Sequence, residues 1–273
     1  MKKLLVPLDF SPCSFNAMEN AIEIADHLNL ELLLFHSFLV PVVAAEYGAA
    51  FSNEALEQAQ ETAQMHFNHV EDAFPRLSEV PYETLIRGGS LVDNIRLLSS
   101  EFDIAMIVMG SHGATGLQRA LLGSNTYSIM NNIHLPVIAL PEKANLKQIK
   151  RIGLAGDYKT TPKPEVLNAV KALANAFYAE VRVIHIDQEK NLDSGQLETA
   201  KSLEKHLKGV KHSFYFKQDF DVEDGLVEFA KEHEIDLLVM VHRHHNFLDR
   251  LMHGSETRRI ALDIPMPLMV IQG

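Results

Sequence analysis

The chain has 273 residues, of which 47% are hydrophobic and 22% charged, and its formal net charge is −11. This length and composition predict a globular protein of one large domain or two ordinary ones. The acidic balance argues against general binding to nucleic acid or to anionic membranes, and no apolar run is long enough for a membrane span. Because Cys13 is the single cysteine, we expect no internal disulfide framework and a reducing, cytoplasmic setting.

Apolar runs alternate with helical patterns through the first half of the chain. The runs typical of buried strands are residues 3–8, 31–36, 80–86, 103–109 and 136–140. Between them, helices are expected at residues 14–28, 53–70, 91–98 and 124–132. Residues 38–51 are irregular and apolar, and they suit either a lid over a pocket or a contact surface. The alternation predicts an α/β fold in which helices cover both faces of a parallel sheet.

The same pattern begins again after a polar and basic linker at residues 142–150. Asp157 follows the first strand of this second copy, as Asp9 follows the first strand of the chain 148 residues earlier. Near the end of each copy, Gly254 corresponds to Gly123 at an offset of 131 residues. The second copy is therefore shorter, and the difference falls around its second helix. Repeats of this length indicate duplication of a whole domain and not a solenoid.

A glycine-rich loop follows the fourth expected strand of the first half. It contains Gly110, Gly113 and Gly116 and ends at Gly123, where a helical pattern starts. Glycine lets the backbone come close to a ligand, and free N–H groups at a helix N-terminus attract anions. A buried strand, such a loop and a helix in this order therefore predict a phosphate site.

Three residues from other strands are expected at the same edge of the sheet. Ligands of parallel sheets bind beyond the carboxyl ends of the strands, and Asp9, Ser37 and Gly88 stand at such ends. The second copy lacks most of the loop glycines, since Val241 stands at the position of Gly110. A side chain there excludes glycine-only conformations, so we expect an anion site in the first half alone. The further replacements are His244 for Gly113, Phe247 for Gly116 and Asp219 for Gly88.

The loop fits the spacing Gly-x2-Gly-x9-Gly-Ser, formed by Gly110, Gly113, Gly123 and Ser124. Together with Val-Pro-Leu-Asp-Phe-Ser at residues 6–11, this spacing resembles the universal stress protein family. The duplication resembles the tandem type of that family, and the resemblance covers essentially the whole chain.

The resemblance carries several implications for fold and function. It implies two tandem doubly wound domains, residues 1–143 and 150–273, each with a five-stranded parallel sheet in the order 3-2-1-4-5. It also implies a stress-response protein that binds ATP, with or without magnesium, and acts as a regulator or sensor.

The same resemblance assigns site roles to residues of the first half. Asp9 would lie on the ribose or adenine side, although read by itself it also suits a helix cap. Pro7 and Leu8 would line that pocket, and the backbone at Ser37 would face adenine. Arg119, within the loop, would add positive charge. The expected site consists of Pro7, Leu8, Asp9, Ser37, Gly88, Gly110, His112, Gly113, Gly123, Ser124 and Asn125.

Nucleotide binding is expected rather than fast catalysis. The loop lacks the lysine of a Gly-x4-Gly-Lys-Ser/Thr phosphate loop, and neither paired carboxylates nor a base for water stand out. A slow ATPase and a ligand-free scaffold are the alternatives. His36 and His185, at matching strand ends, are expected to be packed and hydrogen-bonded rather than catalytic. A metal site is the alternative for the second-half histidines, whose spacing matches no zinc pattern: His242, His244, His245 and His253.

The fifth strand commonly joins subunits in single-domain members of the family that the chain resembles. We therefore expect residues 136–140 and 267–271 to pair the two halves within this chain as an intramolecular pseudo-dimer. A homodimer through other edges stays open, and the sequence identifies no protein partner.

Overall fold

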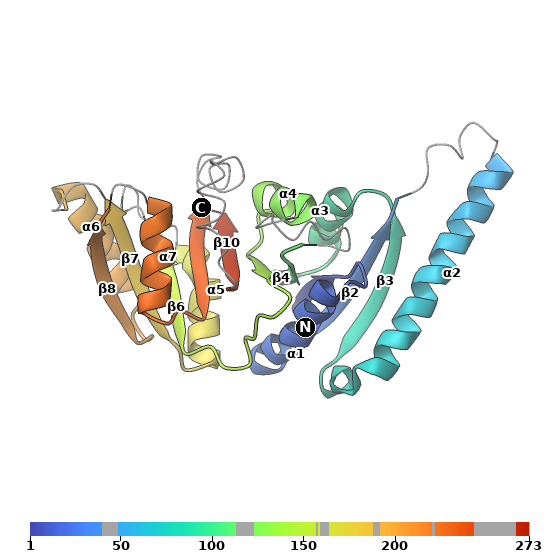
Figure 1. The fold of residues 1–273 in the computed structure, drawn as a ribbon, viewed down its shortest axis with the longest axis horizontal. Helices are drawn as coiled ribbons and strands as arrows, with labels where there is room; N and C mark the ends of the chain where they lie inside the picture. The colour runs from blue at the N-terminus through green and yellow to red at the C-terminus, as the bar shows by residue number, and fades with distance from the viewer. Residues whose placement is uncertain are drawn as a thin grey trace.

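The strands of the computed structural model form a single sheet. The structure describes residues 1–39, 49–112, 123–156, 158, 164–187, 192–219, 222–242 and 266–272, without the side chains of 49–54, 164, 165, 223 and 242. The sheet has ten strands in the order β3-β2-β1-β4-β5-β10-β9-β6-β7-β8 (Figure 1). The expected order 3-2-1-4-5 therefore occurs once in each half, and the expected α/β fold is confirmed.

The helices and strands begin and end close to the residues expected from the sequence. The strands are β1 (Lys3–Pro7), β2 (Glu31–Phe38), β3 (Tyr82–Gly88), β4 (Ile104–Gly110), β5 (Val137–Leu140), β6 (Arg151–Ala155), β7 (Glu180–Asp187), β8 (His212–Gln218), β9 (Leu237–His242) and β10 (Leu268–Gln272). The helices are α1 (Pro12–Leu28), α2 (Ala49–Ala73), the short 3-10 helix η2 (Pro75–Glu79), α3 (Leu91–Glu101), α4 (Ser124–Asn132), α5 (Pro164–Ala176), α6 (Ser194–His206) and α7 (Val222–Glu232).

The two halves meet at their fifth strands. β10 pairs antiparallel with β5, with Val270 opposite Val137, whereas the other strand pairs of the sheet are parallel. Gln272 adds a hydrogen bond across this seam, from its side-chain Nε2 to the carbonyl oxygen of Met130 at 2.5 Å. The expected pairing of the two halves within the chain is confirmed.

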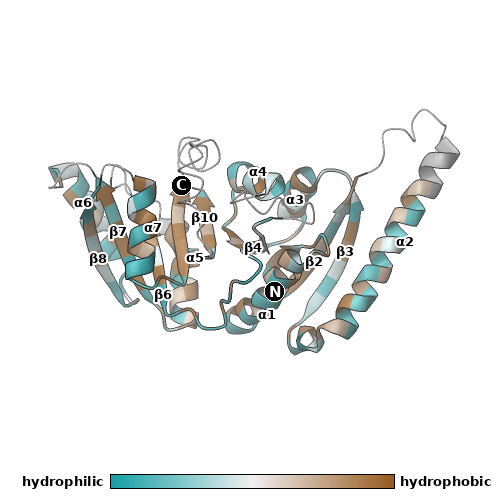
Figure 2. Cartoon of the chain, viewed as in Figure 1, coloured by the Kyte–Doolittle hydropathy of each residue, from teal (hydrophilic) through white to brown (hydrophobic). Residues whose placement is uncertain are grey.

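Helices cover both faces of the sheet. Alternate strand residues point to opposite faces, so Leu4 and Val6 lie in the core beneath α1, α2, α5 and α6, whereas Leu5 lies in the core beneath α3 and α4. α7 covers that second face in the other half, where Phe229 is 1% exposed. Figure 2 shows the strands next to the seam, β9 and β10, as largely hydrophobic. Both large clusters contain residues of both halves, so the halves share one packed interior.

The segment between the halves is anchored to α1. Within it, Leu146 is 0% exposed and Ile149 is 1% exposed. The buried side chain of Asn20 in α1 accepts a hydrogen bond from the backbone N–H of Leu146 at 2.5 Å and donates one to the carbonyl oxygen of Ala144 at 3.3 Å. The polar composition of residues 142–150 concealed this docking, because its partner lies 126 residues earlier in the chain.

The second helix accounts for most of the difference in length between the halves. α2 has 25 residues and its counterpart α6 has 13. Most of α2 is exposed, but Ala63, Phe67 and Val70 form a buried stripe on it. The helix stands beside β3 at one end of the molecule (Figure 1). Among the described helices, none has the length and apolar character needed to cross a membrane. The boundaries at residues 143 and 150 stay a prediction.

Candidate functional site

Carboxyl ends of four adjacent strands meet at one edge of the first half. β1 lies between β2 and β4, and β3 follows β2. The N–H of Leu8 extends the ladder by donating to the carbonyl oxygen of Phe35 at 2.8 Å. Asp9 follows β1 closely. Ser37 is the penultimate residue of β2, and Gly88 and Gly110 are the last residues of β3 and β4. The four positions that the sequence assigned to this edge therefore all stand at neighbouring strand ends.

Gly110 is required by the close approach of α1. A Cβ atom at this position would lie 2.9 Å from Sγ of Cys13 and 3.1 Å from its backbone carbon. The backbone carbon cannot move aside as a flexible side chain could. The carbonyl oxygen of Gly110 accepts a hydrogen bond from Oγ1 of Thr126 at 3.0 Å. Glycine at this strand end thus lets α1 approach β4, and the hydrogen bond from Thr126 ties α4 to the same strand end.

The N-terminus of α4 is fastened over the end of β4. The N–H of Gly123 donates to the carbonyl oxygen of Ser111 at 2.6 Å, and Gly123, the N-cap residue, has no side chain with which to cap the first turn. Ser124 and Asn125 are exposed. Amides of a first helical turn lack partners within the helix and can donate to an anion. Gly113, Gly116 and Arg119 of the loop lie outside the described residues.

Asp9 does not cap α1 itself. Ser11 is the N-cap, and its Oγ accepts a hydrogen bond from the N–H of Ser14 at 3.2 Å. Asp9 supports this cap, because its Oδ1 accepts from Oγ of Ser11 at 2.6 Å and from the N–H of Ser11 at 3.1 Å. The Asp9 side chain is nevertheless exposed. Ser11 is thus the residue that caps α1, and Asp9 holds this capping residue in place.

Pro7 and Leu8 contribute little exposed surface. Both are buried, and the side chain of Leu8, 3% exposed, packs in the core. The carbonyl oxygen of Leu8 lies 2.7 Å from Nδ1 of His36, so His36 is packed and hydrogen-bonded, as expected.

A stack of aromatic rings beside these residues was not foreseen from the sequence. Phe10 has a left-handed backbone, φ 61°, and its ring lies 4.7 Å from the rings of both His36 and His66. The signal was present in the repeat, since Tyr158 stands at the corresponding position of the second copy and also has a positive φ of 52°.

His112 lies at the start of the glycine loop among several polar groups. Its Nδ1 is 3.0 Å from Oγ of Ser111 and 3.9 Å from Sγ of Cys13. Its Nε2 is 4.0 Å from a carboxylate oxygen of Glu142. Neighbouring groups therefore flank both ring nitrogens of His112. Glu142 is a neighbour that sequence spacing did not suggest.

Comparison with known proteins places this architecture in a family. The profile of the universal stress protein family matches residues 1–141 and 217–272. The chain belongs to the universal stress protein family. Universal stress protein Rv1996 of Mycobacterium tuberculosis is 30% identical over 158 residues, which cover 51% of this chain and 48% of that protein. The chain thus spans about half the length of the mycobacterial relatives that it matches.

Two further relatives come from archaea. Universal stress protein MJ0577 of Methanocaldococcus jannaschii is 27% identical over 158 residues, covering 52% of this chain and 96% of that protein. The crystal structure of a universal stress protein from Archaeoglobus fulgidus covers 99% of this chain and 96% of its own at 17% identity, with a TM-score of 0.72. That structure supports the fold along both halves.

The second half of this universal stress protein fills the corresponding edge with its own side chains. The ring of Tyr158 stacks on His185 at 4.4 Å, and Nδ1 of His185 lies 2.9 Å from the carbonyl oxygen of Gly156. Tyr158 is 3% exposed, and burial raises the pKa of its hydroxyl to about 12. Gln196 of α6 donates to Asp187 at the end of β7 at 3.1 Å. His185 is thus packed and hydrogen-bonded, as expected.

The sheet register corrects one alignment between the halves. The offset of 131 residues places Asp219 opposite Gly88, but Gly88 pairs with Phe38 as Gln218 pairs with Asp187. Gln218 is therefore the structural counterpart of Gly88. Neither Asp219 nor Gln218 is a glycine, so the inference of asymmetry is unchanged.

The histidine-rich segment of the second half lies almost wholly beyond the described residues. Of the four candidate metal ligands, the backbone of His242 ends β9, and His244, His245 and His253 fall outside. Among the described residues, no group of three histidine, cysteine, aspartate or glutamate side chains could hold a metal ion.

Proposed function

We propose that the first half of this universal stress protein binds ATP, with or without magnesium, and that the chain acts as a cytoplasmic stress-response regulator or sensor. The proposed site comprises Asp9, Ser37, Gly88 and Gly110 together with the glycine loop and the start of α4. Residues 1–143 would form the binding domain, and residues 150–273 would form a degenerate copy. The ligand-contacting residues proposed are Pro7, Leu8, Asp9, Ser37, Gly88, Gly110, His112, Gly113, Gly123, Ser124 and Asn125.

The observation that carries this proposal is the way α4 meets β4. Hydrogen bonds from Gly123 and Thr126 fasten a helix start directly over the strand end, and exposed Ser124 and Asn125 begin that helix. First-turn amides and the Ser124 hydroxyl can satisfy phosphate oxygens. Asp9, on the neighbouring strand end, has a carboxylate that can accept hydrogen bonds from ribose hydroxyls.

Pro7 and Leu8 fit the proposal through their backbone rather than their side chains. Since both side chains are buried, an adenine ring in this pocket would contact main-chain atoms around β1 and β2. The ring of Phe10, which lies between those of His36 and His66, would support the main chain on the adenine side of the site.

Binding is favoured over catalysis on the chemistry of the site. Fast phosphoryl transfer needs a positioned base or water-orienting group and charge at the transferred phosphate. His112 stands at the start of the loop, and it is held between Ser111, Cys13 and Glu142. A slow ATPase stays as the second candidate. Turnover well above that of a Gly113→Val control would support it.

Calorimetric titration of the full chain with ATP tests the proposal. We expect one nucleotide per chain, because Val241 in β9 replaces Gly110. Asp9→Ala should weaken binding about tenfold to a hundredfold, since a hydrogen bond to a charged group contributes about 1.5–3 kcal/mol. Gly113→Val should abolish binding by closing the loop.

Two control variants separate a ligand contact from a local structural effect. Ser11→Ala removes the α1 cap that Asp9 supports, but it leaves the carboxylate in place, so its affinity should stay near that of the wild type. Asp157→Ala alters the second-half counterpart of Asp9 and should also bind normally. Equal binding by Asp9→Ala, Gly113→Val and the wild type would show that the site is wrong, and two nucleotides per chain would refute the asymmetry.

A further inference from the structure

The sheet ends at β8 on one side and at β3 on the other (Figure 1). An edge strand presents backbone groups to which another strand can bind, and proteins commonly protect such edges with proline, bulges or charge. β8, His-Ser-Phe-Tyr-Phe-Lys-Gln, contains neither proline nor glycine and pairs with β7 in unbroken register. Within the described residues, β7 is its single neighbour in the sheet. β8 is therefore an open edge rich in residues that favour strands.

Hydrogen bonds to β7 determine which backbone groups of β8 point outward. The N–H of Val181 donates to the carbonyl oxygen of Lys211 at 2.8 Å, and at the other end of β8 the N–H of Asp219 donates to β7 at 3.0 Å. Odd-numbered residues of β8 thus face β7. Because alternate residues of a strand bond to opposite neighbours, the even-numbered residues direct their N–H and C=O groups outward. Phe214 and Phe216 are among them, and each is 39% exposed.

The opposite edge strand has no comparable aromatic surface. Thr84 and Ile86 of β3 occupy the register positions of Phe214 and Phe216, and both are partly buried beside the long helix α2. The shorter α6 leaves the two phenylalanines of β8 in contact with solvent. Exposure of large aromatic side chains on an open edge is thus a property of the second half.

β8 is complementary to itself when two copies run antiparallel about Tyr215. In this register Lys211 faces Asp219 of the second copy, so opposite charges meet at both ends of the pair. Phe214 faces Phe216 of the second copy, and aromatic cross-strand pairs stabilise sheets. Sliding the strands by two residues in one direction brings Lys211 opposite Lys217, and sliding them in the other direction brings Phe214 opposite Gln218. The sequence of β8 thus favours one register.

We propose that two copies of this chain form a dimer through antiparallel pairing of their β8 strands, centred on Tyr215. The chain already uses this mode internally, because β5 and β10 join two parallel half-sheets edge to edge through one antiparallel pair. Each copy carries a net charge of −11. At the contact itself, Lys211 of one copy meets Asp219 of the other at both ends of the pair, and the charge of Lys217 is paired with Glu228 of its own chain. The contact joins two sheets of ten strands into one.

The oligomeric mass of the full chain in solution is the first test. Sedimentation velocity over a micromolar dilution series should show a species of twice 30.6 kDa. The double variant Phe214→Thr/Phe216→Thr keeps strand-favouring residues but removes the aromatic pairs, and it should weaken association at least about tenfold. Tyr178→Asn is the matched control, since Tyr178 is an aromatic residue that is 95% exposed and lies outside β8. It should dimerise like the wild type.

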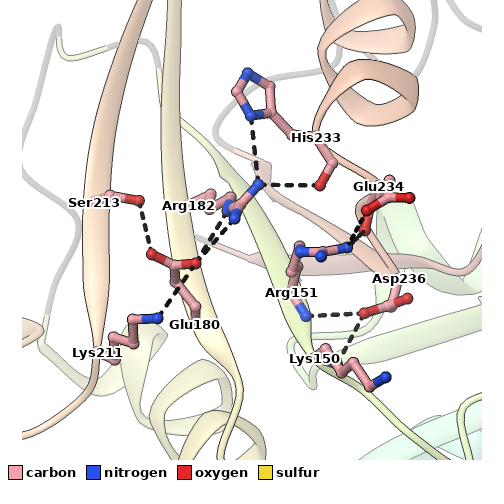
Figure 3. A network of polar contacts seen from close by, with 9 residues as sticks. All are labelled: Lys150, Arg151, Glu180, Arg182, Lys211, Ser213, His233, Glu234 and Asp236. Atoms are coloured by element: carbon pink, nitrogen blue, oxygen red, sulfur yellow. Dashed lines mark hydrogen bonds and ion pairs between the residues drawn. The ribbon is translucent and has the colours of Figure 1, made fainter.

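Charge exchange tests the register. Lys211→Glu should raise the dissociation constant about tenfold, because glutamate then faces Asp219 at both ends. The double variant Lys211→Glu/Asp219→Lys should restore association, because opposite charges meet again. Lys211 also lies 3.9 Å from Glu180 of its own chain (Figure 3), but it is 78% exposed there, and exposed ion pairs contribute little stability. Circular dichroism would confirm that each variant is folded.

Disulfide trapping tests the same register while leaving the two phenylalanines and the terminal charges of Lys211 and Asp219 unchanged. Ser213 and Lys217 face each other as a non-hydrogen-bonded pair, whose Cα separation of about 4.5 Å suits a disulfide. Within one chain they are about 13 Å apart along the strand, so Ser213→Cys/Lys217→Cys can cross-link only between copies. Each single variant is a control, and Cys13 is 2% exposed. A covalent dimer of the double variant alone supports the proposal.

Three results would overturn it. The first is a monomeric wild type across the dilution series. The second is a dimer that neither the phenylalanine nor the charge variants weaken, since the interface would then lie elsewhere. The third is the absence of a covalent dimer from the folded double-cysteine variant under oxidising conditions.

Discussion

The ends of β4 and β9 show how the two halves of this universal stress protein differ. At the end of β4, Gly110 admits Cys13 of α1 to within 2.9 Å of where a Cβ would lie. In β9 the same place is taken by Val241, and at the end of β6 a buried Tyr158 stacks on His185. Both halves keep the sheet order 3-2-1-4-5. The fold therefore tolerates a side chain in β9 at the position where the close approach of α1 requires glycine in β4.

The edges of the sheet differ for a similar reason. α2 buries Phe67 and Val70 beside β3, whereas the shorter α6 leaves Phe214 and Phe216 of β8 partly exposed. The first half thus has exposed Asp9 and Ser124 at its carboxyl edge and a covered edge strand, whereas the second half has a buried Tyr158 at that edge and an exposed edge strand. Four substitutions test how far this division of properties holds.

Val270→Asp should have the largest effect, because it acts on the seam that the halves share. Val270 is 1% exposed and faces Val137 of the other half. A carboxylate there would be buried without a partner, which costs about 3–5 kcal/mol. Chemical denaturation should show the loss in both halves together. Tyr178→Asp, at a position that is 95% exposed, should be nearly neutral, and separate transitions for the halves would contradict a shared core.

Gly110→Val makes the first half resemble the second. The new side chain collides with Cys13, so we expect a loss of about 1–3 kcal/mol in the free energy of unfolding, together with a loss of ATP binding. Gly110→Ala should cost less. Combining Gly110→Ala with Cys13→Ala should recover part of the lost stability, since the 2.9 Å contact to Sγ disappears while the 3.1 Å contact to the backbone stays. A fully stable Gly110→Val variant would show that α1 moves aside without cost.

Ser11→Ala should have a moderate effect confined to stability. It removes the side chain that caps α1 at the N–H of Ser14, and such caps contribute about 1 kcal/mol. Thermal unfolding measures the loss, while the ATP affinity of the same variant should be unchanged. A variant that loses affinity as Asp9→Ala does would assign Asp9 to the helix cap instead of the ligand.

His233→Phe should have the smallest effect, and it should depend on pH. Burial, with the nearby charge of Arg182, lowers the pKa of His233 below its usual 6.5. Nη1 of Arg182 lies 3.4 Å from Nδ1 of His233 (Figure 3), and the rings of Tyr215 and Phe229 and the side chains of Lys217 and Glu232 surround it.

The sign of this pH effect follows from the direction of the shift. The unfolded chain binds the proton more tightly, so the stability from neutral His233 is fully present above pH 6.5 and is lost as the pH falls below it. As the pH falls below 6.5, the free energy of unfolding should therefore decrease more for the wild type than for the variant. Phe102 stands at the matching place of the first half, and Phe102→Leu should leave the pH profile unchanged.

The sequence alone predicted the repeating pattern of the fold. Periodicity placed the strands, Gly110 and Gly123 marked the end of β4 and the start of α4, and the second copy reproduced the order of elements. The strand ends at Asp9, Ser37, Gly88 and Gly110 followed from topology, because parallel strands bring their carboxyl ends to one edge. Even the seam between β5 and β10 was predicted, through the resemblance to single-domain relatives.

What the tertiary structure decided depends on contacts between distant residues. Asn20 anchors the segment at Leu146, 126 residues away, and Ser11 takes the capping role that the local sequence suggested for Asp9. The outward direction of the backbone at Phe214 and Phe216 required the register with β7. Sequence periodicity records which face of an element is buried, because each element carries that pattern itself. The partner on that face is a property of the packed chain, and it appears only when the elements are assembled.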